Sequence, residues 1–572
     1  LVLSISRRGP ALTNFKGSAI TATQSAATTN AANAVIALGT VYKTITSIDT
    51  SGMKLAQTVS AANATGSVTF NAGGLGVATL TGGASNDTFT VAETANVVHD
   101  IDGGAGTADV LNLAVTTGFV DVGDITNVET VNVTVKAGTD ITIDGAEEFD
   151  SSVDDITIAG GNSLSTFTAA TIHTNIETVD ASTFQGNLVA DFAANAMDNT
   201  VTVTGGLLTT DAITALYTTE ATYAAKVSAV EILNVSMVEA GTKTLTFNLE
   251  NVTGATTLAT TVDDLDTVTY TNLGTENIQI VSAKDDSTVE GQLVSSAGST
   301  DTVSFELKDA GTNVEAGVKL KTTDVETVTV KASTAESVDL SALSMATGVM
   351  TLNATGVAAL TVSATHADVT TIDASGMTTG GSFVQTGRSA TAASTYTGSA
   401  GADTFIMMNK SDVLDGAAGT NDTLDINKAF VLGGIEIDLS STTNQVTTFN
   451  GSANAAVQKG FENVDVSGVT GSFGAQITAI STGSTITGTT NADVVNGGVG
   501  NDVYVLADLT TDTVNGVSGT DSLAAVGGVT IANSDDFATY TNFDKLIASS
   551  ATASVISFSS HADFFTDTGI GT

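Results

Sequence analysis

Short runs of β-branched residues, separated by Gly, Asn and Asp, recur along almost the whole chain from Val41 onward. The runs 131–135, 244–247 and 327–330 alternate apolar and polar residues, which is typical of half-buried strands. The 572 residues include 57 glycines and a single proline, so turns are plentiful and almost every residue can donate a backbone hydrogen bond to a strand ladder. The sequence therefore predicts an all-β fold of elongated, stacked β layers, as in a β-solenoid, a β-roll or sandwich-like units, with little helix.

Helical patterns are scarce in this sequence. The first 40 residues are rich in Ala, Thr and Asn, and we expect them to form a loop or a short helix. The best helix candidate is segment 218–230, and a second is 340–345. The apolar face of the first candidate would consist of Ala221, Ala224, Ala225 and Val227.

A first internal repeat is the phrase Asn-(Val/Ile)-Glu-Thr-Val or a near variant of it. It occurs at 127–131, 175–179 and 324–328, with weaker copies at 461–464 and 542–546. The irregular spacing predicts similar β layers with variable insertions, each layer burying its face on its neighbours. The Glu of the stronger copies is expected to face solvent rather than to bind a ligand. These residues are Glu129, Glu177 and Glu326.

A second repeat consists of three blocks, at 82–111, 398–424 and 488–523, in which a Gly-rich turn, an Asp and an apolar residue occur twice. In the third block Asp493 and Asp502 lie nine residues apart, which is one period of such a coil. The blocks divide the chain into expected segments. These are an N-terminal segment 1–40, a β segment 41–79, a first block 80–125, a β-repeat region 126–395, a second block 396–430, a β segment 431–485, a third block 486–525 and a C-terminal β segment 526–572.

The residue types in the blocks point to a cation. Glycine accepts positive φ, so a tight turn can direct its backbone carbonyls at one point, and the Asp that ends the turn adds carboxylate oxygens. Ca²⁺ takes about six to eight oxygen ligands, and the chain has no cysteine that would favour a softer metal. The sequence therefore predicts Ca²⁺ as the cofactor, held by neighbouring pairs of turns. The candidate ligands are Asp87, Asp102, Gly104, Gly106, Asp109, Asp403, Asp415, Gly416, Gly419, Asp422, Asp493, Gly498, Gly500, Asp502 and Asp521.

The segment 497–504, Gly-Gly-Val-Gly-Asn-Asp-Val-Tyr, resembles the calcium-binding nonapeptide of RTX, or haemolysin-type, proteins. Elsewhere Ser85 and Ser399 each stand at a motif glycine, and one additional residue precedes Asp109 and Asp422. The resemblance implies a parallel β-roll that binds Ca²⁺ and a chain that leaves the cell by type I secretion.

The rest of the chain is similar to the bacterial RTX-type surface-layer (S-layer) proteins, which are acidic, cysteine-free and rich in Thr, Ala, Gly and Asn. The phrases at 371–376 and 461–464 carry this similarity. It implies a calcium-dependent, two-dimensional crystalline coat on the cell surface.

The charge balance excludes several classes of partner. Eighteen Lys and Arg residues against 61 Asp and Glu residues give a formal net charge of −43. A nucleic-acid binder needs a basic surface, and an anionic membrane surface would repel this chain. No apolar stretch approaches the roughly 18 residues that a membrane-spanning helix needs. We therefore expect no nucleic-acid partner and no membrane insertion.

Catalytic motifs are absent from the sequence. It contains no His-Glu-x-x-His helix, no Gly-x-Ser-x-Gly elbow and no Gly-Lys-(Ser/Thr) phosphate loop. Carboxylate pairs such as Asp263/Asp264 and Glu147/Glu148 do not stand out from the general acidity. The four histidines are scattered and are read as incidental; they are His99, His173, His366 and His561. The sequence favours a protein that is not an enzyme.

The function expected from these features is that of an extracellular structural protein that self-assembles with Ca²⁺ into a surface lattice. Its partners would be further copies of itself and a cell-surface glycan such as lipopolysaccharide. The alternative is a calcium-dependent RTX adhesin that binds a glycan or another surface. A secreted hydrolase with calcium turns as a folding aid is a third, weaker hypothesis.

Overall fold

The computed structural model divides the chain into two compact units, Leu1–Ile278 and Gln279–Thr572. All elements of the described residues are β-strands. The described residues are 2–5, 17–24, 36–40, 43–52, 57–72, 78–93, 99–116, 124–144, 152–238, 242–263, 265–284, 286–308, 318–345, 348–378, 380–389, 392–505, 512–525, 530–531, 539–548 and 555–556. Nearly all strand pairs in them are parallel, as expected of a β-solenoid. The expectation of an all-β fold of stacked layers is confirmed.

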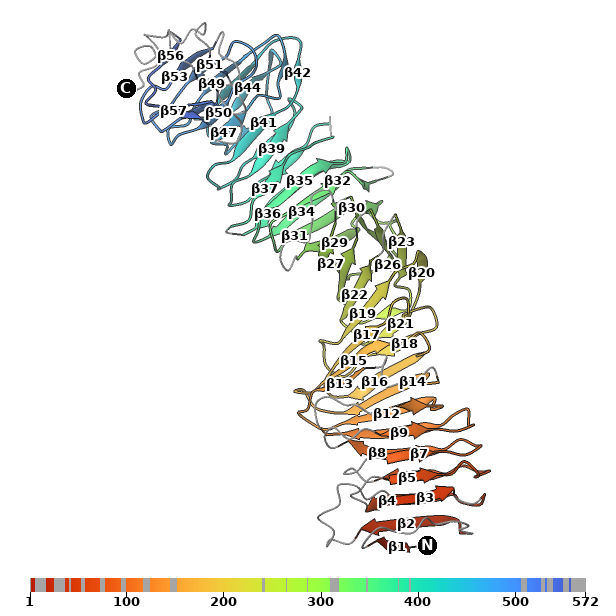
Figure 1. Ribbon diagram of the computed structural model, residues 1–572. Coiled ribbons are helices and arrows are strands. Elements are labelled where there is room, and N and C mark those ends of the chain that lie inside the picture. The colour runs from red at the N-terminus through yellow and green to blue at the C-terminus, as the bar shows by residue number, and fades with distance from the viewer. Residues whose placement is uncertain are drawn as a thin grey trace. The chain divides into compact units, whose positions relative to one another are not determined.

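In the first unit, successive strands alternate between sheets, so that each circuit of the chain adds one coil to the stack (Figure 1). One sheet runs the length of the unit and contains twelve strands among the described residues. They are, in spatial order, β1 (Val2–Ile5), β2 (Ala19–Gln24), β4 (Ser47–Gly52), β6 (Thr69–Ala72), β8 (Thr88–Glu93), β10 (Val110–Val115), β12 (Thr130–Val135), β14 (Asp155–Gly160), β16 (Thr178–Phe184), β18 (Thr202–Thr204), β21 (Lys226–Ser228) and β24 (Val252–Thr253).

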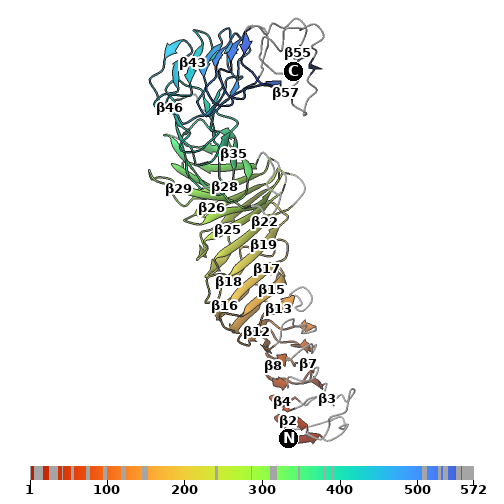
Figure 2. The same ribbon diagram turned by 90° about the vertical axis from the view of Figure 1, so that its left-hand side faces the viewer.

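The opposite side of the first unit changes sheet along the stack. Figure 2 shows β13, β15, β17, β19 and β22 beside one another in the second of these sheets. The first consists of β3 (Ile36–Thr40), β5 (Gln57–Ser60), β7 (Ala78–Thr81), β9 (Asp100–Asp102) and β11 (Ile125–Thr126). The second consists of β13 (Ile141–Asp144), β15 (Thr166–Ile172), β17 (Asn187–Phe192), β19 (Ala212–Tyr217), β22 (Ile232–Met237) and β25 (Thr257–Val262). A third side begins with β20 (Ala221–Tyr223), β23 (Thr244–Asn248) and β26 (Thr267–Leu273).

The second unit is built on the same principle, and β27 (Asn277–Ala283) contains the division between the units. One side consists of β29 (Thr302–Leu307), β31 (Thr327–Ala332), β34 (Met350–Gly356), β36 (Val369–Met377), β38 (Thr395–Thr397), β40 (Val413–Asp415) and β46 (Gln458–Lys459). The other consists of β28 (Thr288–Leu293), β30 (Val318–Thr323), β32 (Glu336–Leu340), β35 (Leu360–Thr365), β37 (Phe383–Gln385), β39 (Thr404–Met407), β41 (Thr423–Ile426), β47 (Asn463–Asp465), β50 (Thr485–Thr487), β52 (Val503–Val505), β54 (Ser522–Ala525) and β57 (Lys545–Ala548).

Toward the end of the second unit a new sheet replaces the first side. It contains β45 (Ser452–Ala453), β44 (Val446–Phe449), β43 (Ile435–Asp438), β49 (Ala475–Thr478), β51 (Val494–Asn496), β53 (Thr513–Asn515) and β56 (Tyr540–Thr541). Short strands complete the set: β33 (Leu343–Ser344) pairs with β30, β42 (Ala429–Phe430) with β48 (Thr470–Gly471), and β55 (Thr530–Ile531) with β58 (Val555–Ile556).

The core of each unit is a set of stacked apolar rows. In β10, Leu111, Leu113 and Val115 are buried, and the intervening residues are only half-buried. The register pairs Leu111 with Phe89 in β8 and with Val131 in β12, so an apolar side chain lies on an apolar side chain from coil to coil. Fully burying an aliphatic side chain of this kind contributes about 1.5–3 kcal/mol. The apolar positions of the period-2 sequence pattern are therefore the side chains that form the buried rows of the solenoid.

The register also explains the irregular spacing of the repeats. The step from Val503 to its partner Ser522 is 19 residues, whereas the step from Thr302 to its partner Thr327 is 25 residues. The strands stay aligned because the additional residues are accommodated between the strands.

The helix predictions are wrong within the described residues. Segment 218–230 forms β20 and β21, and in it Tyr223, Ala225 and Val227 are buried at every second position, which is strand rather than helix periodicity. Of segment 340–345, residues 343–344 form β33. In the N-terminal segment 1–40 the described residues form β1, β2 and β3 together with a bend at 17–18, so a loop or short helix is also wrong there. A short Ala-rich stretch fits both periods, and packing against the neighbouring coils decides for the strand.

Candidate metal site: the acidic turns

The structure stacks the aspartates of each block in pairs. Each Asp directly precedes a strand, and the paired strands align Thr88 with Val110, Thr404 with Thr423, and Val503 with Ser522. Adjacent coils therefore bring together Asp87 with Asp109, Asp403 with Asp422 and Asp502 with Asp521. In each pair the backbone N–H of the first Asp donates to the carboxylate of the second, at 2.5 Å, 2.8 Å and 2.8 Å respectively.

The nine-residue spacing between Asp493 and Asp502 does not place them in one pair. Asp493 precedes β51 and Asp502 precedes β52, which belong to different sheets. The coil partner of Asp493 is Asp512, whose Oδ1 accepts the N–H of Asp493 at 2.9 Å. Asp512 was not among the predicted ligands, because no Gly-rich turn precedes it in the sequence.

Six buried aspartates of the described residues close their own turns, and we call these the closed turns. In each, Oδ2 accepts the N–H of a residue four or five positions earlier, and Oδ1 accepts an N–H from the preceding coil. At Asp502 these donors are Gly498 and Ser484, both at 2.8 Å. The closed turns are those of Asp87, Asp211, Asp403, Asp412, Asp493 and Asp502.

In the last turn of each block the buried Asp lacks this closing hydrogen bond within the described residues, and we call these three turns the open turns. They belong to Asp109, Asp422 and Asp521, which are at most 1% exposed. Oδ1 of each accepts the N–H of the Asp in the preceding coil. No donor in the described part of the chain reaches Oδ2 of any of the three. A buried polar atom without a partner normally costs about 1–3 kcal/mol, more if it is charged.

The open turns arise from a competing local hydrogen bond. The N–H groups of Gly104, Ala417 and Val517, which could have closed the turns, instead donate to the side chain two residues earlier. These acceptors are Asp102, Asp415 and Asn515, each at 3.0 Å. The three donors have φ values of 96°, 71° and 67°, the left-handed conformation that such an Asx turn permits. Two predicted ligands, Asp102 and Asp415, therefore shape the turn by capping a backbone amide.

The buried carboxylates carry raised pKa values. The pKa of Asp109 is raised to about 6, chiefly by burial and also by the neighbouring carboxylates of Asp87, Glu129 and Asp102, although the N–H of Asp87 opposes the rise. The pKa of Asp422 is likewise raised to about 7, chiefly by burial, with smaller contributions from the carboxylates of Asp403, Glu462 and Asp415. The pKa of Asp521 is raised for the same reason, with Asp544 as the nearby carboxylate. A bound cation would relieve this cost by compensating the charge.

The predicted glycines lie against these carboxylates and against neighbouring backbone. A Cβ at Gly106 would lie 2.3 Å from Oδ2 of Asp109, and one at Gly419 would lie 2.9 Å from both carboxylate oxygens of Asp422. Gly416 and Gly500 approach the backbone of the next or preceding coil, at Gly460 and Gly483 respectively. Gly498 donates its N–H to Asp502, as described above.

Ser399, which stands at a motif glycine, strengthens a closed turn. Its N–H donates to Oδ2 of Asp403 at 2.6 Å, and its hydroxyl lies 2.9 Å from Oδ1. Ser85 instead donates to the carbonyl of Thr65 in the preceding coil. Both departures from the nonapeptide therefore keep a hydrogen bond in the turn.

The donor set of the open turns fits a hard cation. Each offers a buried carboxylate oxygen without a donor, and oxygen is the ligand that Ca²⁺ prefers. Within the described residues no three Asp, Glu or His side chains converge, so backbone carbonyls would have to supply the remaining ligands. The closed turns are poorer candidates because backbone N–H groups already bind their carboxylates.

The Glu residues of the first repeat have a role that the sequence did not reveal. Oε2 of Glu129 accepts the N–H of Asp109 at 2.6 Å, and Glu326 accepts that of Asp301 at 2.9 Å. Both are half-buried, so the expectation that they simply face solvent is wrong, whereas Glu177 is exposed as expected. Glu231, Glu462 and Asp544 bind in the same way to Asp211, Asp422 and Asp521. The two repeats are therefore successive coils of one hydrogen-bonded stack.

The closed turn of Asp211 was also missed. Its signal was present in the sequence, since Gly205 precedes Asp211 by six residues, as Gly103 precedes Asp109. It was missed because no second Gly-rich turn follows nearby, so the two-part plan that defines the blocks is absent there.

The histidines lie away from the open carboxylates where they are described. His99 is buried, and its Nδ1 accepts the N–H of Ala78 at 3.1 Å, so it caps a coil rather than being incidental. Burial lowers the pKa of His99. His366 lies 3.1 Å from Asp368, and His561 lies outside the described residues.

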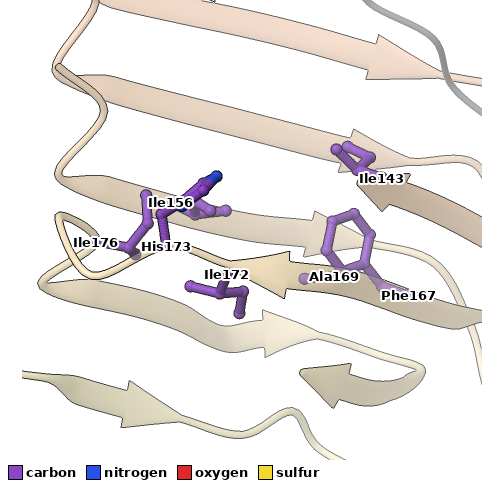
Figure 3. A pocket seen from close by; sticks show the side chains of 7 residues that line it. All are labelled: Ile143, Ile156, Phe167, Ala169, Ile172, His173 and Ile176. Atoms are coloured by element: carbon purple, nitrogen blue, oxygen red, sulfur yellow. The ribbon is translucent and has the colours of Figure 1, made fainter. Parts of the chain in front are cut away.

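Two hollows do not resemble a catalytic centre. The first lies in the first unit and is lined by Ile143, Ile156, Phe167, Ala169, Ile172, His173 and Ile176. Figure 3 shows the aliphatic side chains and the ring of Phe167 around it, with His173 as the single polar side chain. The second is an open groove on the sheet of β43, β44, β49 and β51, and its polar lining includes Glu436, Asp438, Thr447, Gln476, Thr478 and Asn496.

Comparison with known proteins adds no further assignment. No protein-family model and no curated protein matches this chain. No helix of the described residues is long and apolar enough to cross a membrane.

Proposed function

We propose that the chain is a structural surface-layer protein: a β-solenoid that Ca²⁺ consolidates at its acidic turns and that self-assembles into a two-dimensional lattice on a bacterial cell surface. The observation that carries the proposal is the set of open turns, in which a solenoid buries carboxylate oxygens without a donor at Asp109, Asp422 and Asp521. Such oxygens are stabilised by a cation that is present outside the cell at sufficient concentration.

Calcium would act on assembly as well as on folding. With a formal charge of −43, copies of the chain repel one another unless cations screen or bridge them. Nine aspartates of the blocks lie in or beside the turns, so bound Ca²⁺ lowers the effective charge of the folded chain; they are Asp87, Asp102, Asp109, Asp403, Asp415, Asp422, Asp493, Asp502 and Asp521. Stacked coils with half-exposed, Thr-rich faces suit a durable scaffold. We propose no catalytic activity.

The experiment is negative-stain electron microscopy of the purified chain in millimolar Ca²⁺ and in excess chelator. We expect ordered sheets with Ca²⁺ and dispersed particles without it. Sheets that persist unchanged in chelator would contradict the calcium requirement, and the absence of sheets in both conditions would contradict the lattice.

A glycan-binding adhesin is the second candidate, and the polar groove of the second unit favours it. The carboxylate, amide and hydroxyl groups of Glu436, Gln476 and Thr478 can hydrogen-bond sugar hydroxyls. A lattice that forms from the pure chain without any glycan would favour the surface-layer function, whereas glycan binding without a lattice would favour the adhesin. Lipopolysaccharide is the first glycan to test, because it would serve either function.

A further inference from the structure

At two further buried aspartates, side chains of the protein itself donate to the carboxylate oxygens. At Asp512, the partner of Asp493, the hydroxyls of Tyr504 and Tyr540 lie 2.8 Å and 3.2 Å from Oδ2. This aspartate is buried, as those of the open turns are, but its second oxygen has donors. Both carboxylate oxygens of Asp512 therefore have hydrogen-bond donors.

At Asp412 an arginine adds to a closed turn, in which the N–H groups of Met408 and Ser394 already bind Oδ2 and Oδ1 at 3.0 Å and 2.9 Å. Arg388 binds Asp412 in a bidentate pair, with distances of 2.8 Å and 2.9 Å, and both side chains are fully buried. The guanidinium also donates to the carbonyl of Ile406 at 2.7 Å and lies 5.1 Å from the ring centre of Tyr396. Asp412 directly precedes β40, as the aspartates of the open turns precede their strands. Arg388 is thus a resident cation at one acidic turn.

The coils between the first and second blocks satisfy their buried carboxylates in similar ways. Asp211 lies in a closed turn, Lys321 lies 3.0 Å from Glu290, and Lys331 lies 2.8 Å from Glu306. Ser333 and Gln279 also donate to Glu306. Hydrogen bonds to Lys331, Ser333 and Gln279 lower the pKa of Glu306 to about 2 although burial opposes them. At Asp211 and Asp301 the N–H donates to a Glu of the next coil, Glu231 and Glu326, rather than to the Asp of an open turn.

We propose that calcium dependence is divided along the chain: release of Ca²⁺ loosens the coils of the open turns, while the β-repeat region 126–395 stays folded without the metal. This inference rests on the proposed function, because it assumes that Ca²⁺ binds at the open turns. It goes beyond that function by stating which coils respond. A solenoid permits this division because each coil contacts mainly its neighbours, so stability is nearly a sum of local terms.

A divided response would give the chain a calcium-independent scaffold. Before Ca²⁺ is available, the β-repeat region would already present folded sheet ends to the loosened blocks on either side. When Ca²⁺ binds, the blocks would order onto these ends, because folding of a repeat array can propagate from coils that are already formed.

The test is hydrogen exchange measured by mass spectrometry on the full chain, with Ca²⁺ and with excess chelator. We compare peptides from 110–115, 423–426 and 522–525, which follow the open turns, with peptides from 155–238 and 348–378. At free Ca²⁺ a hundredfold above Kd, chelation should speed exchange of the first group by up to about 100-fold. The second group should change less than about twofold, which is within ordinary scatter of local opening.

The outcomes separate the inference from the proposed function. If all peptides, including 155–238, lose protection together, the division is wrong but calcium dependence stands. If no peptide changes, both the division and the calcium part of the proposed function are wrong. An Arg388→Met variant supplies a second test, because 413–415 should lose protection even in Ca²⁺, whereas Lys331→Met should leave 413–415 unchanged. Unaltered protection of 413–415 in Arg388→Met would overturn the role of Arg388 as a resident cation.

Discussion

The open turns and the closed turns have nearly the same sequence and differ in one hydrogen bond. At Asp502 the N–H of Gly498 reaches Oδ2, whereas at Asp521, one coil later, the N–H of Val517 donates to Asn515 instead. The closed turn satisfies its carboxylate with backbone alone, and the open turn leaves one buried oxygen for a cation. The Gly and Asp content of a turn therefore does not by itself define a metal site. An Asn precedes the first glycine in both turns, Asn496 and Asn515, so the two arrangements differ in which oxygen accepts the turn amide.

The largest expected effect comes from removing closed aspartates. Asp493→Ala together with Asp502→Ala leaves buried N–H groups of Ala475, Thr489 and Ser484 without acceptors. Each unsatisfied group costs about 1–3 kcal/mol. We expect a lower midpoint of thermal unfolding for the third block, and an equal loss in Ca²⁺ and in chelator. If the midpoint of thermal unfolding falls only in Ca²⁺, these carboxylates bind the metal themselves. That result would contradict the distinction between open and closed turns.

Removing the charge of an open turn should act through calcium alone. Asp521→Asn keeps an oxygen for the N–H of Asp502 but removes the carboxylate. With Ca²⁺ a hundredfold above Kd, the stabilisation lost is about 2.7 kcal/mol, and the stability in chelator should not fall. Calcium-dependent shifts of the thermal midpoint measure both quantities. Asp286→Asn, whose side chain is 61% exposed, is the control for a changed net charge and should preserve the calcium response.

A glycine substitution tests how tightly an open turn is packed. Gly106→Ala would place a methyl group 2.3 Å from Oδ2 of Asp109, whereas a Cβ at Gly66 meets nothing within 4 Å. Overpacking of this kind costs about 1–3 kcal/mol. We expect Gly106→Ala, measured by urea unfolding in Ca²⁺, to be destabilised and Gly66→Ala to match the parent chain. Equal stability of the two variants would contradict the described geometry of the open turn.

The smallest expected effect is a pH dependence in calcium-free solution. The folded-state pKa values of about 6 for Asp109 and about 7 for Asp422 lie above the ordinary value of 3.8. A carboxyl group with a raised folded pKa is more protonated in the folded chain, so its contribution to stability is complete below about pH 3.8 and is lost as the pH rises through 6 to 7. The thermal midpoint in chelator should therefore fall between pH 5 and pH 8. In saturating Ca²⁺ this fall should shrink or reverse, and an identical fall in both conditions would argue against a cation at these oxygens.

Much of the fold was predictable from the sequence, because period-2 runs such as 131–135 specify both the strand and its buried face. The segment 218–230 was not predictable in the same way, since its alanines fit either period and only the neighbouring coils select Tyr223, Ala225 and Val227 as the buried row. The candidate site was found by residue type, but its division into open and closed turns was not. That division depends on whether an Asx side chain captures an amide at positive φ, which spacing alone does not show.

The partners of the turns were the least visible part of the sequence. Arg388 and Asp412 are 24 residues apart, and Asp422 and Glu462 are 40 residues apart. Only the register of the coils brings such residues together. The Glu of the Asn-Val-Glu-Thr-Val phrase could have been recognised by its position, one residue before each strand and one coil after an Asp, once the coil length was known.

The most direct test of the account is the stoichiometry of Ca²⁺ bound by the full chain, measured by isothermal titration calorimetry. The chain is compared with a triple variant, Asp109→Asn, Asp422→Asn and Asp521→Asn. We predict that the parent chain binds Ca²⁺ and that the triple variant loses the sites at these three turns while the coils of 126–395 stay folded. Equal binding of Ca²⁺ by both chains, or none by the parent chain, would contradict the claim that the open turns hold the metal.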